Sequence, residues 1–437
     1  YGLKHAPLRP PQEDTREHSR REHEEQESLR SANPVLPMEY DWVDRAPLKG
    51  DGEDDELRAL LEVVRLVELE EDVYRFGLYG TLDPKRDPMT AAGLLKARAR
   101  FVERLEAAGE ADLVARFDPA AYNPHATLAE NVLFGTPTVP EFQAGALAEQ
   151  PVVRRILREQ ELDGDLARMG LQIAKTMIEL FADLPPGHPF FEQFSFIDAD
   201  DLPEFKALAA RADKGGIEAL SAGEQARFLR LTFGYTEARH RLGLLDEAME
   251  QRLLRVRQAL AAALEEGKVK GIEPYNPEQY NDAASIQDNI LFGRLVYGQA
   301  QGEAVVGRLV AEVLDELDLK GRVLAVGLDF NVGIAGKRLS SAQRQKLAMA
   351  RALLKDADLL IVNDALGVID GATHARLVAA ILAARSERGV LWCLSRASAA
   401  AGFDQVMVLE RGRKVAEGSF EELAAEGSPL ARLVAAG

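Results

Sequence analysis

The sequence has 437 residues, 46% of them hydrophobic and 28% charged, an ordinary composition for a globular protein with room for two or three domains. Its net charge of −18 disfavours a protein that binds nucleic acid, and no apolar run approaches the roughly 20 residues that span a bilayer. Cys393 is the only cysteine, which excludes an internal disulfide, and the histidines show no metal-ligand spacing.

Residues 1–55 are polar and contain little that could form a core. Pro10 and Pro11 precede a charged run at 13–30 that mixes Glu, Arg and His. Such a run can form a solvated helix, but it cannot bury an apolar face. No secretory signal opens the chain. We predict that this segment is a linker or an extended arm.

Residues 56–270 are predicted to be mostly helical. Apolar residues recur at helical spacing near both ends of the region, and Pro-rich breaks such as 184–189 separate the helices. The insertion at 136–270 contains an aromatic stretch, 189–197, which we interpret as core; a docking surface for a partner is the alternative. The apolar residues at helical spacing are Leu57, Leu60, Leu61, Val64 and Val67 near the start of the region, and Leu242, Leu245, Met249, Leu253 and Val256 near its end.

An internal repeat connects this helical region with the rest of the chain. Residues 117–135 align without a gap with residues 275–293, and 8 of the 19 positions are identical. The similarity continues weakly, since 162–171 resembles 319–328. A chance coincidence of two helix starts is the simpler explanation, but so many identities at fixed spacing favour partial duplication of a helical unit, with copies at 117–171 and 275–328.

The last region, 271–437, alternates helices with short apolar runs and is predicted to be an α/β domain. The runs at 359–362, 390–394 and 406–409 suit buried strands. A turn and a second strand within 410–418 and a short helix at 420–423 follow the last run. The strand at 359–362 leads into polar side chains, which is where open α/β sheets bind ligands.

Two short strings open helices with a Ser followed three residues later by Glu or Gln. Ser340 and Gln343 form one such pair, and Ser221 and Glu224 form the other. Taken alone, each pair predicts a capping box, in which the two residues satisfy each other's backbone N–H groups. Only the first pair precedes a strand that ends in polar residues, so we predict ligand chemistry only there.

The order of these elements resembles the nucleotide-binding domain of ABC transporters across roughly residues 275–425. The string Ser285-Ile-Gln-Asp-Asn-Ile-Leu-Phe-Gly293 is similar to the exporter-type segment after the glutamine loop. The strings Leu339-Ser-Ser-Ala-Gln-Arg-Gln345 and Asp358-Leu-Leu-Ile-Val-Asn-Asp364 resemble the family's signature and its magnesium-binding strand. The resemblance implies a P-loop-NTPase-like sheet with helices, and it implies ATP and Mg²⁺ as ligands.

The resemblance also implies a role for each site residue. Ser340, Ser341, Ala342 and Gln343 would form the signature loop that binds the γ-phosphate of ATP held by a partner domain, as a helix N-terminus can. Asn363 would lie at the magnesium-supporting position and Asp364 at the catalytic position. Asp370 would lie in the dimer-contact loop and Ser395 at the switch-histidine position.

Five substitutions, two of them in the signature, depart from the family pattern and predict weakened hydrolysis. Ser341 and Ala342 replace glycines, so side chains crowd the approach of backbone to phosphate. Asn363 lacks the carboxylate that magnesium prefers. Asp364 is one methylene shorter than glutamate, and a displacement of about 1 Å can lower a rate about a hundredfold. Ser395 has no imidazole.

The sequence contains no Gly-x-x-x-x-Gly-Lys-Ser/Thr phosphate loop. The nearest string, Asn331–Arg338, lacks the first glycine and ends in Arg, so we predict a surface turn there. The family pattern would place the phosphate loop before the first repeat copy. It either lies before Tyr1 in a longer protein, together with a membrane domain, or never existed.

Three functions remain open from the sequence. The first is the ATP-binding part of an exporter at the cytoplasmic face of the membrane, with a transmembrane domain and a second ATPase domain as partners. The second is a catalytically inactive ABC-like domain for dimerisation or regulation. The third, a soluble ABC-type ATPase of DNA repair or translation, is disfavoured by the acidic net charge and by the exporter-like Asn289–Gly293.

Overall fold

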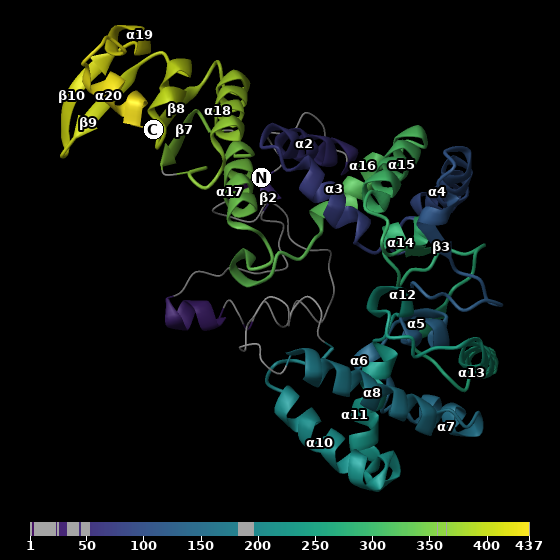
Figure 1. Ribbon diagram of the computed structural model, residues 1–437. Coiled ribbons are helices and arrows are strands. Elements are labelled where there is room, and N and C mark those ends of the chain that lie inside the picture. The colour runs from purple at the N-terminus through teal and green to yellow at the C-terminus, as the bar shows by residue number, and fades with distance from the viewer. Residues whose placement is uncertain are drawn as a thin grey trace. The chain divides into compact units, whose positions relative to one another are not determined.

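The computed structural model describes residues 2–3, 23, 26–32, 43–44, 53–181, 196–355, 357–363 and 365–436. They form a mixed α/β structure in which helices predominate and each sheet has two strands (Figure 1). By their contacts they form two units, unit 1 with Tyr1–Arg75 and Leu328–Gly437, and unit 2 with Phe76–Gly327. The sequence-based division into 1–55, 56–270 and 271–437 stays a prediction, and most of the arm lies outside the described residues.

Unit 1 contains the three apolar runs that were predicted as buried strands. The strands are confirmed, but the prediction that they are buried is wrong, because Leu359, Leu391 and Leu409 are exposed. The strands are β7 (Leu359–Asn363), β8 (Gly389–Cys393) and β9 (Val406–Glu410). The turn expected at 331–338 is also confirmed, since it contains only a 3-10 turn at Ile334–Gly336. Helix α3 (Glu70–Leu78) begins in unit 1 and ends in unit 2. The other elements of unit 1 are β1 (Gly2–Leu3), β2 (Val43–Asp44), α2 (Glu53–Leu66), α17 (Ser341–Leu353), α18 (Gly371–Ala384), a 3-10 turn (Ala397–Gly402), β10 (Arg413–Gly418), α19 (Phe420–Leu423) and α20 (Pro429–Ala436).

Unit 2 is mostly helical, as predicted for the region before residue 271. Its core gathers apolar side chains from α5, α7, α8, α11 and α13. Its helices are α4 (Pro88–Ala107), α5 (Leu128–Leu133), α6 (Ala144–Leu147), α7 (Pro151–Glu159), α8 (Asp163–Phe181), α10 (Leu202–Gly215), α11 (Ala222–Phe233), α12 (Glu237–His240), α13 (Glu247–Glu265), α14 (Ile286–Leu291), α15 (Gly302–Glu316) and α16 (Lys320–Leu328). Its strands are β3 (Val114–Arg116), β4 (Gly135–Pro137), β5 (Ile272–Pro274) and β6 (Gly293–Leu295), with 3-10 turns at Ala111–Leu113, Pro140–Phe142 and Ile217–Ala219.

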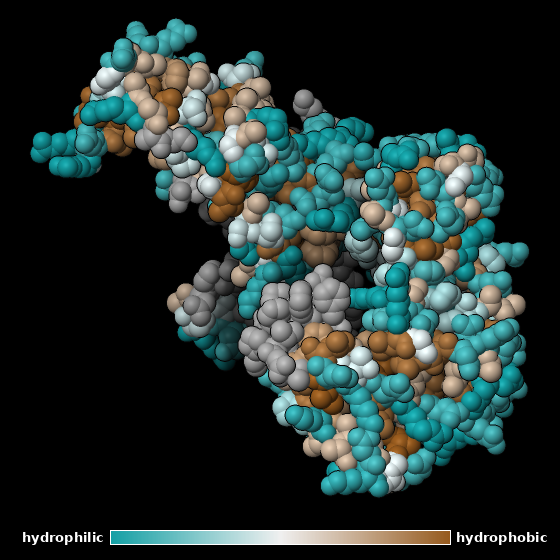
Figure 2. All heavy atoms as spheres, viewed as in Figure 1, coloured by the Kyte–Doolittle hydropathy of each residue, from teal (hydrophilic) through white to brown (hydrophobic). Residues whose placement is uncertain are grey.

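Strands β7 and β8 form a parallel pair with one apolar face in solvent. Leu360 and Val362 of β7 are buried, whereas Ile361 is 63% exposed and Leu391 of β8 is 57% exposed. Brown, apolar side chains also reach the visible surface around β9 and β10 in Figure 2, where Leu409 is 64% exposed. Parallel strands are usually covered on both faces. This face is therefore one that further structure could cover.

The string Asn-x-Leu-Phe-Gly, shared by the two repeat copies, adopts the same backbone in both. Phe134 follows α5 with φ 43° and ψ 47°, and Phe292 follows α14 with φ 43° and ψ 49°. A Cβ on Gly135 would lie 2.6 Å from the carbonyl oxygen of Glu273, and one on Gly293 would lie 2.6 Å from that of Ala115. Each glycine therefore permits a close strand pairing, β4 with β5 and β6 with β3.

We predict that Gly135→Ala and Gly293→Ala each destabilise unit 2 by about 1–3 kcal/mol, because the added methyl group meets backbone that cannot move aside cheaply. Gly307→Ala is the control. Gly307 lies within α15 with open space around its missing Cβ, so alanine there should stabilise by up to about 1 kcal/mol. The measurement is the unfolding free energy in urea. Equal behaviour of the three variants would contradict the close pairing.

Candidate functional site

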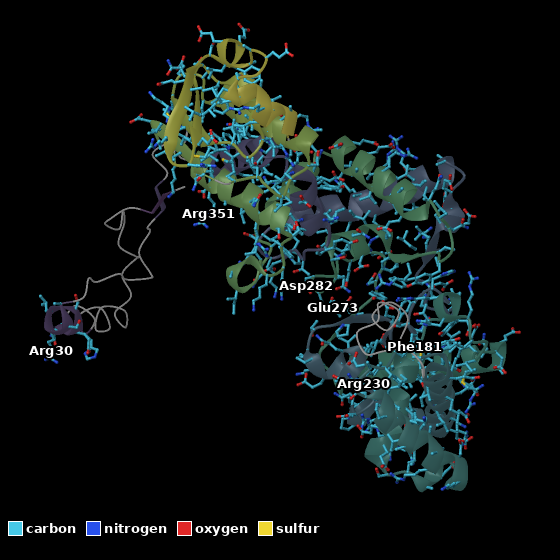
Figure 3. All side chains as sticks on the ribbon, turned by 60° about the vertical axis from the view of Figure 1, so that its left-hand side comes forward. Arg30, Phe181, Arg230, Glu273, Asp282 and Arg351 are labelled. Carbon is cyan, nitrogen blue, oxygen red and sulfur yellow. The ribbon has the colours of Figure 1, made fainter. Side chains whose placement is uncertain are left out.

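Helix α17 begins where the capping box was predicted. The Ser340 hydroxyl oxygen accepts a hydrogen bond from the backbone N–H of Gln343 at 3.1 Å, and Gln343 Oε1 accepts one from the backbone N–H of Ser340 at 2.8 Å. These two bonds stop the chain from continuing as extended backbone and start the helix. The helix then runs to Leu353, and Arg351, labelled in Figure 3, lies in its last turn.

The first turn of α17 has the properties of an anion-binding helix start. The backbone N–H groups of Ser341 and Ala342 are the first of the helix, so they have no acceptor within it. The turn contains no acidic residue, and the Arg344 guanidinium donates to the Ser341 hydroxyl at 3.0 Å. Ser340 and Ser341 are exposed. A phosphate oxygen could reach both amides, with the arginine close by.

Residues 68–72, at the start of α3, contact α17 and α18 within unit 1. Gln343 Nε2 donates to Asp72 Oδ1 at 2.7 Å, and Lys346 Nζ donates to the carbonyl oxygen of Glu68 at 2.9 Å. Arg376 of α18 forms an ion pair with the Glu68 carboxylate, with 3.0 Å between Nε and Oε1. The Gln343 side chain is therefore engaged at both ends, and it holds the start of α17 in place.

The loop after β7 also reaches α17. The backbone N–H of Val368 donates to Gln345 Oε1 at 3.4 Å. Asp370, which ends this loop, caps α18 by accepting from the backbone N–H of Thr373 at 3.0 Å. That hydrogen bond lowers the pKa of Asp370, so its carboxylate is charged at neutral pH. The structure thus brings the predicted signature segment and the loop that holds Asp370 together.

Two further predicted residues lie at the carboxyl edge of the β7–β8 pair. Asn363 pairs with Cys393 in the parallel register, and Ser395 follows two residues after Cys393. The side chains of Asn363 and Ser395 are exposed at this edge. Asp364, the predicted catalytic acid, lies outside the described residues.

Other parts of the predicted site are not joined by direct contacts. Within the described ranges, no hydrogen bond or ion pair connects Ser340 with Asn363 or Ser395, and the convergence of these positions stays a prediction. The same residues contain no group of three or more His, Cys, Asp or Glu side chains that could hold a metal ion. No helix among them is long and apolar enough to cross a membrane.

Helix α11 provides an internal comparison for α17. It begins with the same capping box, formed here by Ser221 and Glu224. Arg211 forms an ion pair with Glu224, and together with the hydrogen bonds from Ser221 it lowers the pKa of Glu224 to about 2. A permanent carboxylate therefore occupies the start of α11, where α17 has the neutral Gln343. The first turn of α17 has no carboxylate of its own, and the Asp72 carboxylate contacts it from outside the helix through Gln343 Nε2.

The sequence reading missed Glu68 and Asp72 as part of this site. The sequence contains a signal for this helix start but not for its contacts, because residues 69–78 match residues 162–171 at five of ten positions. The local structure agrees: Glu68 and Glu161 both adopt positive φ before the helix, and both segments contain an Asp–Arg ion pair three residues apart, Asp72 with Arg75 and Asp165 with Arg168. The identities are Leu69, Asp72, Arg75, Gly77 and Leu78 with Leu162, Asp165, Arg168, Gly170 and Leu171.

About a third of the chain is similar to curated bacterial proteins. Over 150 residues, or 34% of this chain and 25% of the relative, it is 38% identical to the beta-(1→2)glucan export ATP-binding/permease protein NdvA of Agrobacterium vitis. It is 35% identical over 151 residues to the ATP-dependent lipid A-core flippase of Xylella fastidiosa, covering 34% of this chain and 24% of the relative. This part of the chain is homologous to ABC exporters.

The homology to ABC exporters covers a limited part of both proteins. A third relative, the ATP-dependent lipid A-core flippase of Burkholderia orbicola, is 37% identical over 154 residues, again 34% of this chain and 25% of the relative. The chain spans about a quarter of the length of the relatives it matches. No family model matches it. The matched length is comparable to segment 275–425, which carries the ABC-like motifs.

We predict that Ser340→Ala and Ser221→Ala each destabilise their own helix by about 1 kcal/mol, because each removes an N-cap acceptor. Hydrogen exchange of the amides in α17 and α11 measures this directly. Each variant is the control for the other, since the capping boxes match.

ATP should slow exchange in the first turn of α17 of the Ser221→Ala protein, and slow it less in the Ser340→Ala protein. Protection of α11 by ATP would contradict the assignment.

Proposed function

We propose that this chain is the ATP-binding part of an ABC transporter, which couples ATP binding and weakened hydrolysis to transport across a membrane. The homology to ABC exporters is the observation that carries the proposal. Its partners would be a transmembrane domain and a second ATPase domain, at the cytoplasmic face of the membrane. The unblocked start of α17 supports a contact with the terminal phosphate of ATP.

The roles of the individual residues follow from the family resemblance and the local chemistry. The amides of Ser341 and Ala342 and the Ser340 hydroxyl would hold the γ-phosphate of ATP bound by the partner domain. Asp364 would orient the attacking water, Asp370 would contact the partner domain, and Ser395 would stand where the family has its switch histidine. Binding of ATP and cleavage of its phosphoanhydride bond would drive the transport cycle.

Weakened hydrolysis is supported by the residues at the edge of the β7–β8 pair. Asn363 is exposed there and offers an amide where a carboxylate would favour magnesium. Ser395 offers a hydroxyl with no basic nitrogen. These two side chains also favour the second candidate function, a catalytically inactive ABC-like module for dimerisation or regulation.

A phosphate loop and further sheet would have to complete the nucleotide site. The exposed Ile361 and Leu391 mark a face of the parallel pair that added helices could cover, and both strands have a backbone edge that could accept a neighbour. This supports a P-loop-NTPase-like sheet that is built only in part by these residues. The helical insertion and the repeat copy at 117–171 would then extend the helical subdomain.

We predict that the isolated 437-residue chain binds ATP weakly, with a dissociation constant above about 1 μM, equivalent to less than about 8 kcal/mol of binding free energy. The reason is that the loop that holds most of the phosphates is not in this sequence. Equilibrium titration with a fluorescent ATP analogue tests this. Sub-micromolar affinity would show that the chain has its own complete site and would refute the proposal.

Two matched substitutions in the same titration test whether α17 makes the contact. Gln343→Glu places a carboxylate at the start of α17, as α11 already has, and should weaken the binding several-fold. Glu224→Gln removes the carboxylate from α11 and should leave the binding unchanged. Equal effects of the two substitutions would mean that binding does not involve α17.

A further inference from the structure

Unit 2 contains two half-units with the same order of elements. Each has a long helix, a short strand, a turn, a short capped helix and a second short strand. In half-unit 1, residues 88–137, these are α4, β3, α5 and β4; in half-unit 2, residues 247–295, they are α13, β5, α14 and β6. Residues of the turns and short helices correspond at a constant offset of 158, for example Asn131 with Asn289.

The turn and short helix of half-unit 2 are held by Arg98, which lies on the long helix of half-unit 1. The side chain is buried, with 7% of the residue exposed, and its guanidinium lies 4.6 Å from the centre of the Phe292 ring. Its shortest hydrogen bonds are from Nε to the carbonyl oxygen of Asn289, 2.7 Å, and from Nη1 to that of Pro277, 2.6 Å. Its acceptors are the carbonyl oxygens of Asn276, Pro277, Gln279 and Asn289, and Asn289 Oδ1.

The reciprocal contact is made by Arg257, which lies on the long helix of half-unit 2. Only 4% of this residue is exposed, and its guanidinium lies 4.5 Å from the centre of the Phe134 ring of half-unit 1. Its Nε donates to the carbonyl oxygen of Asn131 at 2.7 Å. Every acceptor corresponds to one used by Arg98: the carbonyl oxygens of Asp118, Pro119, Ala121 and Asn131, and Asn131 Oδ1.

These two arginines bind carbonyl groups and not carboxylates. Burial lowers the pKa of Arg98 and of Arg257 to about 10, and both side chains remain charged at neutral pH. Each guanidinium faces the last carbonyls of a short helix, where the helix dipole favours a cation. Removing an arginine would take a donor from the buried carbonyl group of Asn289 or Asn131 and from part-buried carbonyl groups of the turn, which is costly.

The strands cross between the half-units in the same way. β3 of half-unit 1 pairs with β6 of half-unit 2, and β5 of half-unit 2 pairs with β4 of half-unit 1. Phe117 and Tyr275, which occupy equivalent positions, stack on each other with ring centres 4.3 Å apart. Arg294 bridges the equivalent acids Glu130 and Asp288. In Figure 1, α4 lies beside α14 and α15, whereas α5 lies beside α13.

We propose that unit 2 is a pseudo-twofold pair of half-units that have exchanged their long helices, and that Arg98 and Arg257 lock the exchange. Within each half-unit an asparagine pair spans the turn, Asn123 with Asn131 and Asn281 with Asn289, and the arginine of the other half-unit binds the carbonyl groups of the same turn. The pair therefore opens and closes as one cooperative body. A displacement of one half-unit is passed to the other through the arginine that the first one contributes.

Hydrogen exchange of the full chain, followed by mass spectrometry, tests this crossed arrangement. Arg98→Met should raise exchange in residues 286–291 about tenfold or more, with a much smaller change in residues 128–133. Arg257→Met should do the opposite. Lys96→Met on α4 and Arg255→Met on α13 remove a charge from an exposed position of the same helices and should change neither segment.

The outcome that overturns the proposal is loss of protection in the half-unit that carries the substitution, or equal loss in both half-units. If the methionine variants do not fold, Arg98→Lys and Arg257→Lys provide the same test with the charge retained, because one ammonium cannot replace the five donors of a guanidinium. A lysine variant with native exchange in the opposite half-unit would likewise refute the lock.

Discussion

The parallel pairing of β7 with β8 is the constraint on which the candidate site depends. Because the strands run in the same direction, the residues that follow them emerge at one edge, and Asn363 and Ser395 lie there. The loop that leaves β7 then meets α17 through Gln345 and caps α18 through Asp370. An antiparallel pairing would send these residues to opposite ends of the sheet, and no common site could form.

Charge at the helix start separates two otherwise similar segments. Both α11 and α17 begin with a serine-based capping box, so capping alone does not identify a ligand site. In α11 the third residue is Glu224, held as a carboxylate by Arg211; in α17 it is Gln343, which is neutral and is anchored by Asp72. The neutral side chain of Gln343 thus leaves the start of α17 open to phosphate, whereas the carboxylate of Glu224 occupies the start of α11.

The sequence predicted well what depends on local chemistry. The apolar runs became β7, β8 and β9 because their side chains suit strands, and Ser340 and Gln343 formed the predicted capping box because both bonds lie within four residues. It did not predict the contacts of Glu68 and Asp72 with α17 and α18, which join residues more than 270 positions apart. Periodicity assigns such residues to a helix but does not say what that helix packs against.

The crossed packing of unit 2 also could not be predicted from the repeat. The repeat identified equivalent residues, including Asn131 and Asn289, but equivalent turns can be held by their own half-unit or by the other one. The choice depends on strand pairing between β3 and β6 and between β4 and β5. Arg98 and Arg257 lie outside the aligned segment, on helices where an arginine usually predicts an exposed position.

The central claim is that the start of α17 contacts the terminal phosphate of ATP. Photolabelling tests it most directly, with an ATP analogue that carries its reactive group on the γ-phosphate and with membranes from cells that express the gene's own product. The account predicts a label on residues 339–346 that excess ATP removes, and none on residues 220–227. A label on 220–227, or protein labelled elsewhere but not at 339–346, would contradict it.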